Sequence, residues 1–270
     1  NLSTITITGN LVRGTYYSAV LVGSSNDTTI QNNVLTSPGQ SGIYFYGLSR
    51  TAMVDNNTIH NATYSGIDLN GMRDAVIRNN TITNISINGI YGYSGTTNLL
   101  IESNFVANVS NYNGIEFAGV SNSTARNNTV VRVVDSSGIL LTAGAENNTI
   151  VNNRLTAVRF GLDNENASRN QWTDNLVINT TDNAVFFTHS FNVTMRNNTL
   201  LNTFDQNSGG YGAGAVYMVN SSSNEFQDMR IIDVAGSVWE LHAGHNNVWK
   251  NVTIQNGRKG FVVQNGTGNS

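Results

Sequence analysis

Several residue types that support common functions are scarce in this chain of 270 residues. It contains no cysteine, one proline and only two lysines, Lys250 and Lys259. The absence of cysteine excludes disulfide bonds and thiolate metal sites. Charged residues make up only 11% of the chain and the net charge is −3, so the sequence lacks the clustered basic residues of a nucleic-acid interface. No apolar run approaches the ~18 residues of a membrane-spanning helix.

Asparagine, in contrast, is abundant and returns at one position about every 23 residues. The recurring residues are Asn10, Asn33, Asn57, Asn80, Asn104, Asn128, Asn153, Asn175, Asn198, Asp228 and Asn251. One interval is longer and contains a Gly-rich stretch, which we interpret as an insertion loop over residues 205–214. Self-similarity at such a period is typical of solenoids, in which each repeat stacks on the next. We therefore expect a single β-helix domain over residues 1–270.

Each repeat contains three short apolar or β-branched runs, and turn residues separate them. The alternation within the runs is that of strands, and no segment sustains a helical period. Three short strands per repeat predict an all-β fold, a right-handed parallel β-helix of about eleven coils. Successive coils of such a helix lie about 4.8 Å apart.

The recurring asparagine differs from the residue that precedes it. The preceding position accepts Gly9 and Lys250, among other residues, and is therefore expected to face solvent. The position that demands asparagine is expected to lie inside the coil, where each amide bonds the main chain and the amides of neighbouring coils. Each such bond contributes about 1 kcal/mol net. We therefore predict a structural asparagine ladder and no catalytic role for it.

Asn-x-Ser/Thr sequons occur about seventeen times, which favours an extracellular, N-glycosylated protein. The sequon at Asn251 falls in the ladder column and is therefore predicted to stay unmodified. The predicted acceptors are Asn26, Asn56, Asn61, Asn79, Asn84, Asn108, Asn122, Asn127, Asn147, Asn166, Asn179, Asn192, Asn197, Asn220 and Asn265.

Two segments carry a recognisable repeat signature: Asn122-Ser-Thr-Ala-Arg-Asn-Asn-Thr-Val and Ser137-Gly-Ile-Leu-Leu. The signature resembles the NosD-type parallel β-helix repeats of the pectate-lyase-like superfamily, and the resemblance covers essentially the whole chain. It implies the fold. The superfamily includes polysaccharide lyases, hydrolases and epimerases, phage tailspikes, adhesins and surface proteins, so the resemblance does not imply one reaction.

In sugar-cleaving members of this superfamily, the active face is the solvent side of one strand column. The corresponding outward residues here are Tyr44, Asp68, Tyr91, Glu116, Leu140, Asp163, Phe186, Tyr217, Trp239 and Val262. For the coil of Trp239, a shift by one residue is an open alternative. Two residues further along the chain lie Tyr46, Asn70, Tyr93, Ala118, Thr142 and Glu165. Tyrosines stack on sugar rings and carboxylates hold hydroxyls. The predicted binding residues are therefore Tyr44, Tyr46, Asp68, Asn70, Tyr91, Tyr93 and Glu116.

The same stripe contains the candidate catalytic carboxylates, Asp68 and Glu116, with Asp163 as a further acid. Asp68 and Glu116 lie two coils apart, roughly 9.6 Å by stacking geometry, at the edge of the range for inverting glycosidases. Neither has a second carboxylate in an adjacent coil, and the stripe contains no Arg or Lys to serve as a lyase base. We therefore expect no catalysis, with a lyase or hydrolase as the alternative.

No metal or other cofactor is expected. Calcium requires six or more oxygen ligands, and no clustered set of acids supplies them. His242 and His245 beside Glu240 are the only close histidine pair. As a zinc site they lack a third ligand held at a rigid spacing.

The ends of the chain show no capping segment. The first residues already alternate as a strand, with no visible signal peptide, and the last coil stops where another strand would begin. Because a solenoid exposes strand edges at its ends, two explanations remain open. The chain is a segment of a longer surface protein, or subunits self-associate by head-to-tail stacking.

These observations predict a non-catalytic, glycosylated structural protein of a cell surface, sheath or filament, possessing an adhesive face that contacts glycans. One alternative is a secreted polysaccharide lyase or glycoside hydrolase that uses Asp68 and Glu116. Another is a carbohydrate-binding module in which the tyrosines bind without cleavage. Neither nucleic acid nor a membrane span is expected.

Overall fold

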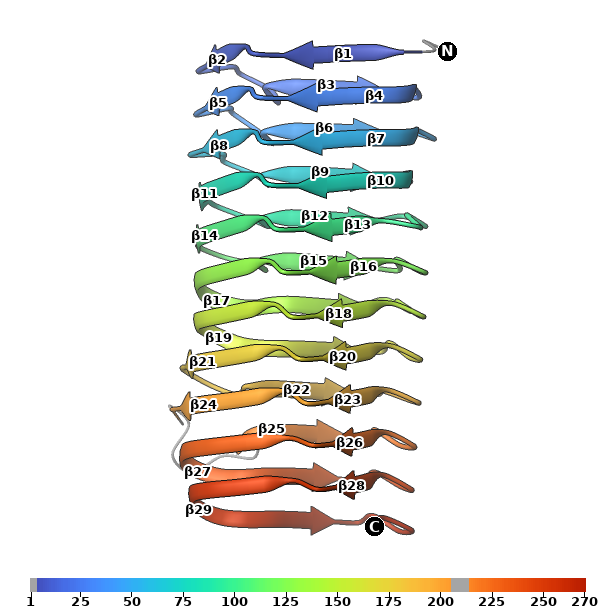
Figure 1. Cartoon of the computed structure of the whole chain (residues 1–270), viewed down its shortest axis with the longest axis vertical. Coiled ribbons are helices and arrows are strands. Elements are labelled where there is room, and N and C mark those ends of the chain that lie inside the picture. The colour runs from blue at the N-terminus through green and yellow to red at the C-terminus, as the bar shows by residue number, and fades with distance from the viewer. Residues whose placement is uncertain (1–3, 205–213) are drawn as a thin grey trace.

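The computed structural model describes residues 4–204 and 214–270, and in this part of the chain all regular secondary structure is β-strand. The strands wind around one axis into a rod of eleven coils, which runs from the N-terminal coil to the C-terminal coil without a break (Figure 1). All pairings between coils are parallel. No helix among the described residues is long and apolar enough to cross a membrane.

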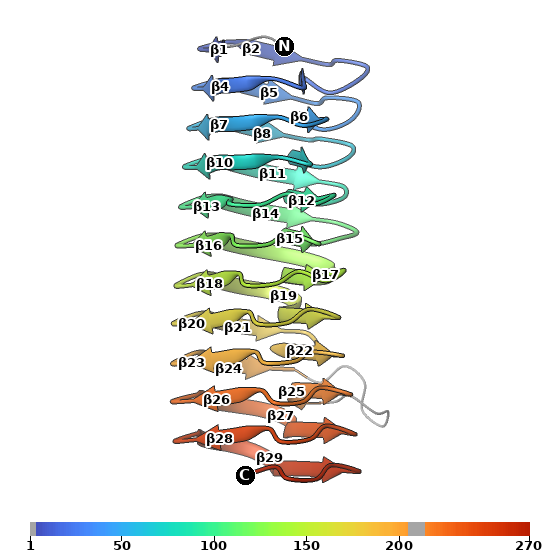
Figure 2. The same cartoon turned by 90° about the vertical axis from the view of Figure 1, so that its right-hand side faces the viewer.

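The strands form three rows, and one coil takes a strand from each row (Figure 2). Row 1 consists of β1 (Ile5–Thr8), β4 (Asn26–Gln31), β7 (Arg50–Asp55), β10 (Arg73–Arg78), β13 (Leu100–Glu102), β16 (Thr124–Arg126), β18 (Thr149–Val151), β20 (Gln171–Thr173), β23 (Thr194–Arg196), β26 (Glu225–Gln227) and β28 (Val248–Lys250). Row 2 contains β2 (Leu11–Arg13), β5 (Val34–Thr36), β8 (Thr58–His60), β11 (Thr81–Ile85), β14 (Phe105–Val109), β21 (Leu176–Thr180) and β24 (Thr199–Thr203). Row 3 contains β3 (Val20–Gly23), β6 (Ile43–Tyr46), β9 (Ile67–Asn70), β12 (Ile90–Tyr93), β15 (Ile115–Ala118), β22 (Val185–Thr188) and β25 (Gly214–Val219). Four strands continue from row 2 into row 3: β17 (Thr129–Thr142), β19 (Arg154–Glu165), β27 (Arg230–His242) and β29 (Thr253–Gln264).

Alternation along each strand places one set of side chains inside the coil and the other outside. In β6, for example, Ile43 and Phe45 are fully buried, whereas Tyr46 is exposed. The inward residues of all three rows merge into one apolar core that extends along the rod. The predicted fold is therefore confirmed, and the expected insertion loop, apart from Gly214, lies outside the described residues.

The asparagine ladder lies inside the turn between rows 1 and 2. Asn57 Nδ2 donates to the main-chain oxygen of Ile30 (2.9 Å) and to Asn80 Oδ1 (3.0 Å), and Asn80 Oδ1 also accepts from the main-chain nitrogen of Asn57. The same pattern links each ladder residue to the next as far as Asn198. Asn10 belongs to the ladder but is exposed, because it lies in the first described coil.

The prediction was wrong for the last two members of the ladder. Asp228 and Asn251 have φ angles of 55° and 51° and occupy the preceding, solvent-facing position of the turn. Asn251 Nδ2 donates to Asp228 Oδ1 on the surface. The ladder position itself is taken by Met229, which is fully buried, and by Val252. Aspartate and asparagine tolerate the left-handed backbone region, so these side chains fit either position of the turn. The alignment of the repeats from the sequence was therefore shifted by one residue in these two coils.

The alignment of the repeats from the sequence is also shifted by one residue in the row 3 part of β27. Trp239 pairs with Val216 and Phe261 in the core column and is fully buried. The outward residue of this coil is therefore Glu240, which pairs with Tyr217.

A second ladder, which the sequence pattern did not predict, lies in the turn between row 3 and the next row 1. Asn148 Nδ2 donates to Asn170 Oδ1 at 3.2 Å, and Asn224 Nδ2 donates to Asn247 Oδ1 at 3.1 Å. In the earlier coils this turn is held by hydroxyls instead, and the Ser123 Oγ accepts from the main-chain nitrogen of Leu99. The repeat of this column is less regular because its turns vary in length.

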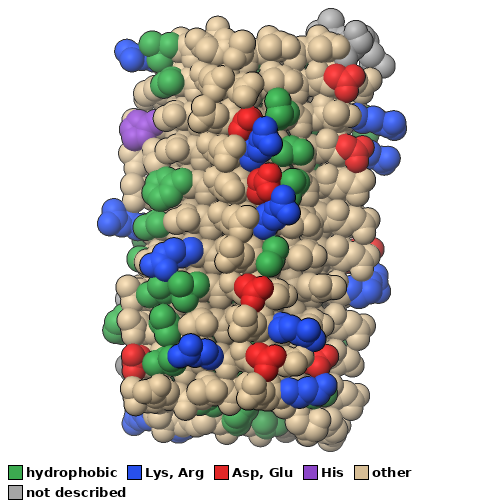
Figure 3. All heavy atoms as spheres, in the orientation of Figure 1, with side chains coloured by type: hydrophobic (Ala, Val, Ile, Leu, Met, Phe, Trp, Pro, Cys, Tyr) green, Lys and Arg blue, Asp and Glu red, His purple; other side chains and the backbone are tan. Residues whose placement is uncertain are grey.

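The outer surface of row 1 carries opposite charges in neighbouring coils (Figure 3). The distance from nitrogen to carboxylate oxygen is 3.1 Å between Arg78 Nη2 and Asp55 Oδ2. It is 2.6 Å between Arg126 Nη2 and Glu102 Oε2, and 2.8 Å between Lys250 Nζ and Glu225 Oε1. Asp55 is buried, whereas the other two pairs are more exposed and each contribute little to stability. Their spacing nevertheless matches the coil register, and this face offers no cluster of one sign.

Candidate functional site

The outer surface of row 3 gathers the predicted site residues in successive coils. Strand pairing aligns Tyr44 with Asp68, Asp68 with Tyr91, and Tyr91 with Glu116. The column continues through Leu140, Asp163, Phe186, Tyr217, Glu240 and Val262. Apart from the exchange of Trp239 for Glu240, the structure places this column as the sequence predicts.

Two tyrosine pairs stand on either side of the Asp68 coil. The rings of Tyr91 and Tyr93 stack with centroids 4.3 Å apart, and those of Tyr44 and Tyr46 lie 5.9 Å apart. The hydroxyls of Tyr44 and Tyr93 are hydrogen-bonded to each other across the intervening coil. Asn70 Nδ2 lies 3.5 Å from the Tyr44 hydroxyl. The tyrosines therefore form a cover above Asp68.

Beneath this cover, Asp68 is only 3% exposed. The Ser41 hydroxyl, one coil earlier, donates to Asp68 Oδ2, whereas Asp68 Oδ1 is buried without a hydrogen-bond partner among the described residues. Burial raises the pKa of Asp68 to about 6, and the hydroxyls of Ser41 and Ser65 partly oppose the shift. The carboxyl group is therefore partly protonated near neutral pH.

Glu116 occupies an equivalent place two coils later and is 9% exposed. Asn113 Nδ2 donates to Glu116 Oε2 at 2.9 Å. Burial raises the pKa of Glu116, the amides of Asn113 and Asn88 lower it, and the charge of Glu165 raises it further. The amide of Asn113 is itself fixed, because its Oδ1 accepts from the Ser136 hydroxyl at 2.7 Å.

Asp163 is the third buried acid of the column and is 3% exposed. The Ser137 hydroxyl donates to its Oδ2 at 2.6 Å, in the same arrangement as Ser41 and Asp68, and its Oδ1 also lacks a partner among the described residues. Burial and the nearby charge of Glu165 raise the pKa of Asp163 well above its ordinary value. Burial also raises the pKa of Glu165.

The three buried acids of the column lie in alternate coils rather than side by side. Asp68 and Glu116 are separated by the coil of Tyr91, and Glu116 and Asp163 by the coil of Leu140. Two coils correspond to about 9.6 Å. The sequence predicted that these side chains face solvent. Both side chains are instead almost completely buried, Asp68 at 3% and Glu116 at 9% exposure.

A second row of tyrosines, which sequence analysis missed, borders this surface. Gly66 and Gly89 donate to the main-chain oxygens of Asn88 and Asn113, which aligns the residues just before these asparagines. Tyr17, Tyr64 and Tyr112 occupy this aligned position in the first, third and fifth coils and are 62%, 53% and 52% exposed. Gln40 and Ile87 occupy it in the coils between. The signal in the sequence was a tyrosine in every second repeat of one column.

The two tyrosine rows lie close together. Burial raises the pKa of Tyr91 to about 12, and the nearby Glu116, Asp68 and Tyr64 contribute to the shift. At the N-terminal end, Tyr16, Tyr17, Ser37 and Gln40 line an open cavity of about 580 Å³. The tyrosine face is defined here as Tyr17, Tyr44, Tyr46, Tyr64, Tyr91, Tyr93 and Tyr112.

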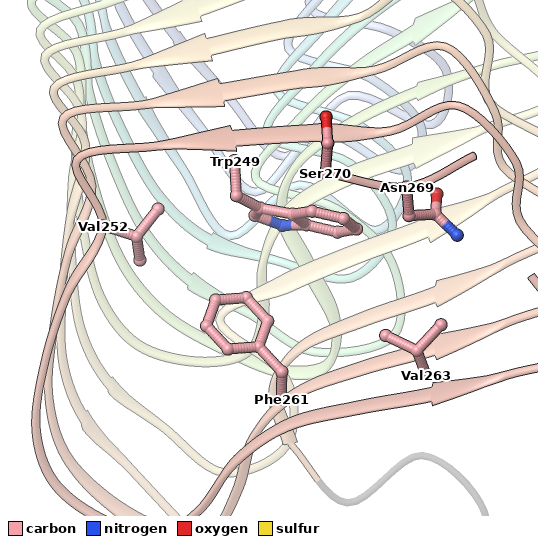
Figure 4. A pocket seen from close by; sticks show the side chains of 6 residues that line it. All are labelled: Trp249, Val252, Phe261, Val263, Asn269 and Ser270. Atoms are coloured by element: carbon pink, nitrogen blue, oxygen red, sulfur yellow. The ribbon is translucent and has the colours of Figure 1, made fainter. Parts of the chain in front are cut away.

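An apolar cavity of about 410 Å³ lies at the other end of the rod, in the last coil. Figure 4 shows the side chains of Trp249, Val252, Phe261 and Val263 turned toward it. These apolar residues belong to the last coil of the solenoid, and Asn269 and Ser270 complete the lining of the cavity. No group of three or more His, Asp or Glu residues suited to a metal occurs in residues 4–204 and 214–270.

The predicted glycan acceptors share one backbone geometry. With the exception of Asn26, each has a φ angle of 48–58°, so it lies at a left-handed turn position that favours asparagine. All are exposed apart from Asn108, which is half-buried. Asn251 has the same geometry and exposure, so the reason for predicting it unmodified is removed.

Comparison with known proteins agrees with the coil architecture. The model of a protein family, described as the right-handed β-helix region, matches residues 1–155 and 65–211. The chain belongs to the right-handed β-helix family. A search of curated proteins finds no significant match.

Solved structures extend this family likeness. The A-module of a mannuronan C-5 epimerase from Azotobacter vinelandii is 11% identical, with a TM-score of 0.74 over 94% of this chain and 76% of the other. The catalytic domain of a GH87 alpha-1,3-glucanase is 13% identical, with a TM-score of 0.68 over 99% and 62%. PfbA, a surface adhesin of Streptococcus pneumoniae, is 16% identical, with a TM-score of 0.53 over 93% and 62%. At such low identity the likeness concerns the fold alone.

Proposed function

We propose that this right-handed β-helix protein is a non-catalytic, extracellular protein that binds polysaccharide on its tyrosine face. The observation that carries the proposal is the combination of exposed and stacked tyrosines with acids that are buried beneath them. Aromatic side chains supply large, rigid contact area for sugar rings. Accessible carboxylates, which cleavage would require, are absent from the same surface in the described residues.

The extracellular part of the proposal draws on the exposed sequons. Glycosylation of Asn-x-Ser/Thr requires an acceptor on the surface. The predicted acceptors lie at solvent-facing turns and therefore meet this requirement. The neighbouring structures are described as epimerases, glucanases and an adhesin, so their reported roles are compatible with an extracellular glycan-binding role here. Head-to-tail association of subunits stays a prediction.

The proposal is tested by affinity electrophoresis of the purified chain through gels that contain one polysaccharide each. Retardation in at least one gel is expected, without new reducing ends or unsaturated products in the polysaccharide. Replacing Tyr44 and Tyr91 together by alanine is expected to abolish the retardation. The control is Tyr217→Ala, which removes a tyrosine from the same column four coils beyond the tyrosine face. Retardation unaffected by the double replacement would refute the proposal.

A hydrolase or lyase remains the second candidate, because one observation favours it. The raised pKa of Asp68, about 6, is a property shared with general acids of glycosidases. This reading requires the Tyr44 and Tyr93 cover to open and admit substrate. Product formation that is lost in both Asp68→Asn and Glu116→Gln would establish it, and would replace the non-catalytic proposal.

A further inference from the structure

The tyrosine face is periodic over two coils rather than one. Its outer row carries Tyr17, Tyr64 and Tyr112 in coils 1, 3 and 5. Its inner row, on row 3, carries the pairs that begin at Tyr44 and Tyr91 in coils 2 and 4. The two rows are therefore offset by one coil, and aromatic side chains are presented at alternating sides of a track that runs along the rod axis.

Packing does not require this alternation. Further along the same inner column, Phe186 and Tyr217 lie in consecutive coils with ring centroids 5.7 Å apart and planes at 15°. Aromatic rings can thus occupy every coil of this column. The gaps at Asp68 and Glu116 in the inner row, and at Gln40 and Ile87 in the outer row, are therefore not imposed by the spacing of the backbone.

The coil spacing suits a sugar chain that runs parallel to the axis. One coil advances by about 4.8 Å, which is comparable to the length of one sugar unit in an extended 1,4-linked β-glycan. Successive sugars of such a chain are turned by about half a revolution, so every second ring presents the same face to the protein. A tyrosine in every second coil then meets equivalent ring faces.

The charge of the track restricts the sugar class further. Neither row carries Lys or Arg in coils 1–5: the outer row reads Tyr, Gln, Tyr, Ile, Tyr, and the inner row begins with Leu21 and then alternates tyrosines with acids. The raised pKa values of Asp68 and Glu116 reflect burial without a cation. A uronate chain would bring its carboxylates toward these acids with no basic partner, so a neutral chain is favoured.

We infer that the tyrosine face binds a neutral, extended 1,4-linked β-glycan along the rod axis, with one sugar per coil over coils 1–5. This inference rests on the proposed function and specifies its ligand. The glycan places alternate sugars against the outer and inner tyrosine rows. The open cavity beside Tyr17 receives the first sugar of the bound segment.

The probes are cellohexaose, laminarihexaose and a mannuronate hexamer, measured by titration calorimetry on the purified chain. Cellohexaose has the proposed linkage, laminarihexaose is neutral but 1,3-linked, and the mannuronate hexamer is 1,4-linked but charged. Binding of cellohexaose at least about tenfold tighter than either of the others is expected, a margin that corresponds to one well-buried aromatic contact. Equal or tighter binding of laminarihexaose or mannuronate would overturn the inference.

A matched swap tests the spacing itself. The double variant Tyr64→Ile with Ile87→Tyr keeps the composition of the outer row but moves one tyrosine into the wrong coil. It is expected to lose about tenfold in affinity for cellohexaose, as much as Tyr64→Ala. Both changes lie at exposed or half-buried turn positions, and thermal unfolding confirms that the variants fold.

The outcomes separate the inference from the proposed function. If the swap variant binds cellohexaose like the original chain, the two-coil register is wrong, although polysaccharide binding by the tyrosine face stands. If another polysaccharide retards the chain but cellohexaose does not bind, the ligand class is wrong. If no polysaccharide binds, the proposed function fails together with the inference.

Discussion

The first five coils expose most of the tyrosines of the chain, whereas the last four coils contain all of its tryptophans in or against the core. Eight of the ten tyrosines lie within the first 112 residues, and each is exposed or half-buried. All three tryptophans lie in coils 8–11 and point into the core, where Trp239 contacts Phe226 and Trp249. Because inward and outward residues alternate along a strand, a coil can change its surface without changing its core. The N-terminal region thereby differs from the C-terminal region in its surface more than in its scaffold.

The largest expected effect concerns the C-terminal core. Replacing Trp239 by alanine removes a fully buried ring from a cluster of four aromatics, and is expected to lower the free energy of unfolding by about 3–5 kcal/mol. Tyr64→Ala, an exposed aromatic of the N-terminal region, is expected to change it by less than about 0.5 kcal/mol. Urea denaturation of both variants tests the contrast. Similar losses would show that the two regions do not differ as described.

The buried acids make the stability of the N-terminal region dependent on pH. Asp68 has a pKa of about 6 in the folded chain against 3.8 unfolded, so the folded state binds more protons between these values. Stability from this group is complete below about pH 4 and is lost as the pH rises through 6. We therefore compare the free energy of unfolding of Asp68→Asn with that of the original chain. This difference is expected to favour the variant by about 2–3 kcal/mol more at pH 8 than at pH 4. Urea denaturation at both pH values measures it, and an equal difference at both would contradict the burial of Asp68.

The first asparagine ladder is the next test, because Met229 replaces it in the C-terminal coils. Asn104→Ala leaves the main-chain nitrogen and Nδ2 of Asn80 without their acceptor, and is expected to lower the free energy of unfolding by about 1–3 kcal/mol. The control is Asn127→Gly, which changes the exposed position of the next turn in a backbone region that glycine adopts freely. A loss no larger in Asn104→Ala than in the control would remove the structural role of the ladder.

The smallest effect on stability is expected at the surface turns. Asn251→Gly is expected to change the free energy of unfolding by less than about 0.5 kcal/mol, because glycine adopts the left-handed backbone of this position freely. When the chain is secreted from a glycosylating host, glycopeptide mass spectrometry is expected to find glycan on Asn251 as well as on Asn197, since both lie exposed at the same turn. Glycan on Asn197 alone would show that exposure does not govern modification here.

The sequence predicts the fold well because the Asn80 and Asn104 column combines a fixed period with a strict residue preference. It fails at Asp228 and Asn251, since these residues satisfy the neighbouring turn position equally well. The second ladder, at Asn148 and Asn224, is obscured by turns of unequal length. Each of these failures concerns one residue of register rather than the architecture.

The candidate site is predicted in position but not in environment. The outward direction of Asp68 follows from alternation along β9, whereas its burial depends on Tyr44 and Tyr93 from neighbouring coils. Such burial is determined by the size and direction of side chains that are distant in the sequence. Tyr64 and Tyr112 were missed because they lie in turns, where strand alternation gives no guide to exposure.

The two-coil period of the tyrosine face affects how the chain tolerates changes in length. Removing one coil from the middle of this face would leave the ladder and core continuous, because every coil offers the same inner contacts. The tyrosines on either side of the deletion would then fall out of phase. Removal or duplication of two coils would preserve both the scaffold and the phase of the tyrosines. The repeating unit of this surface is therefore the coil pair.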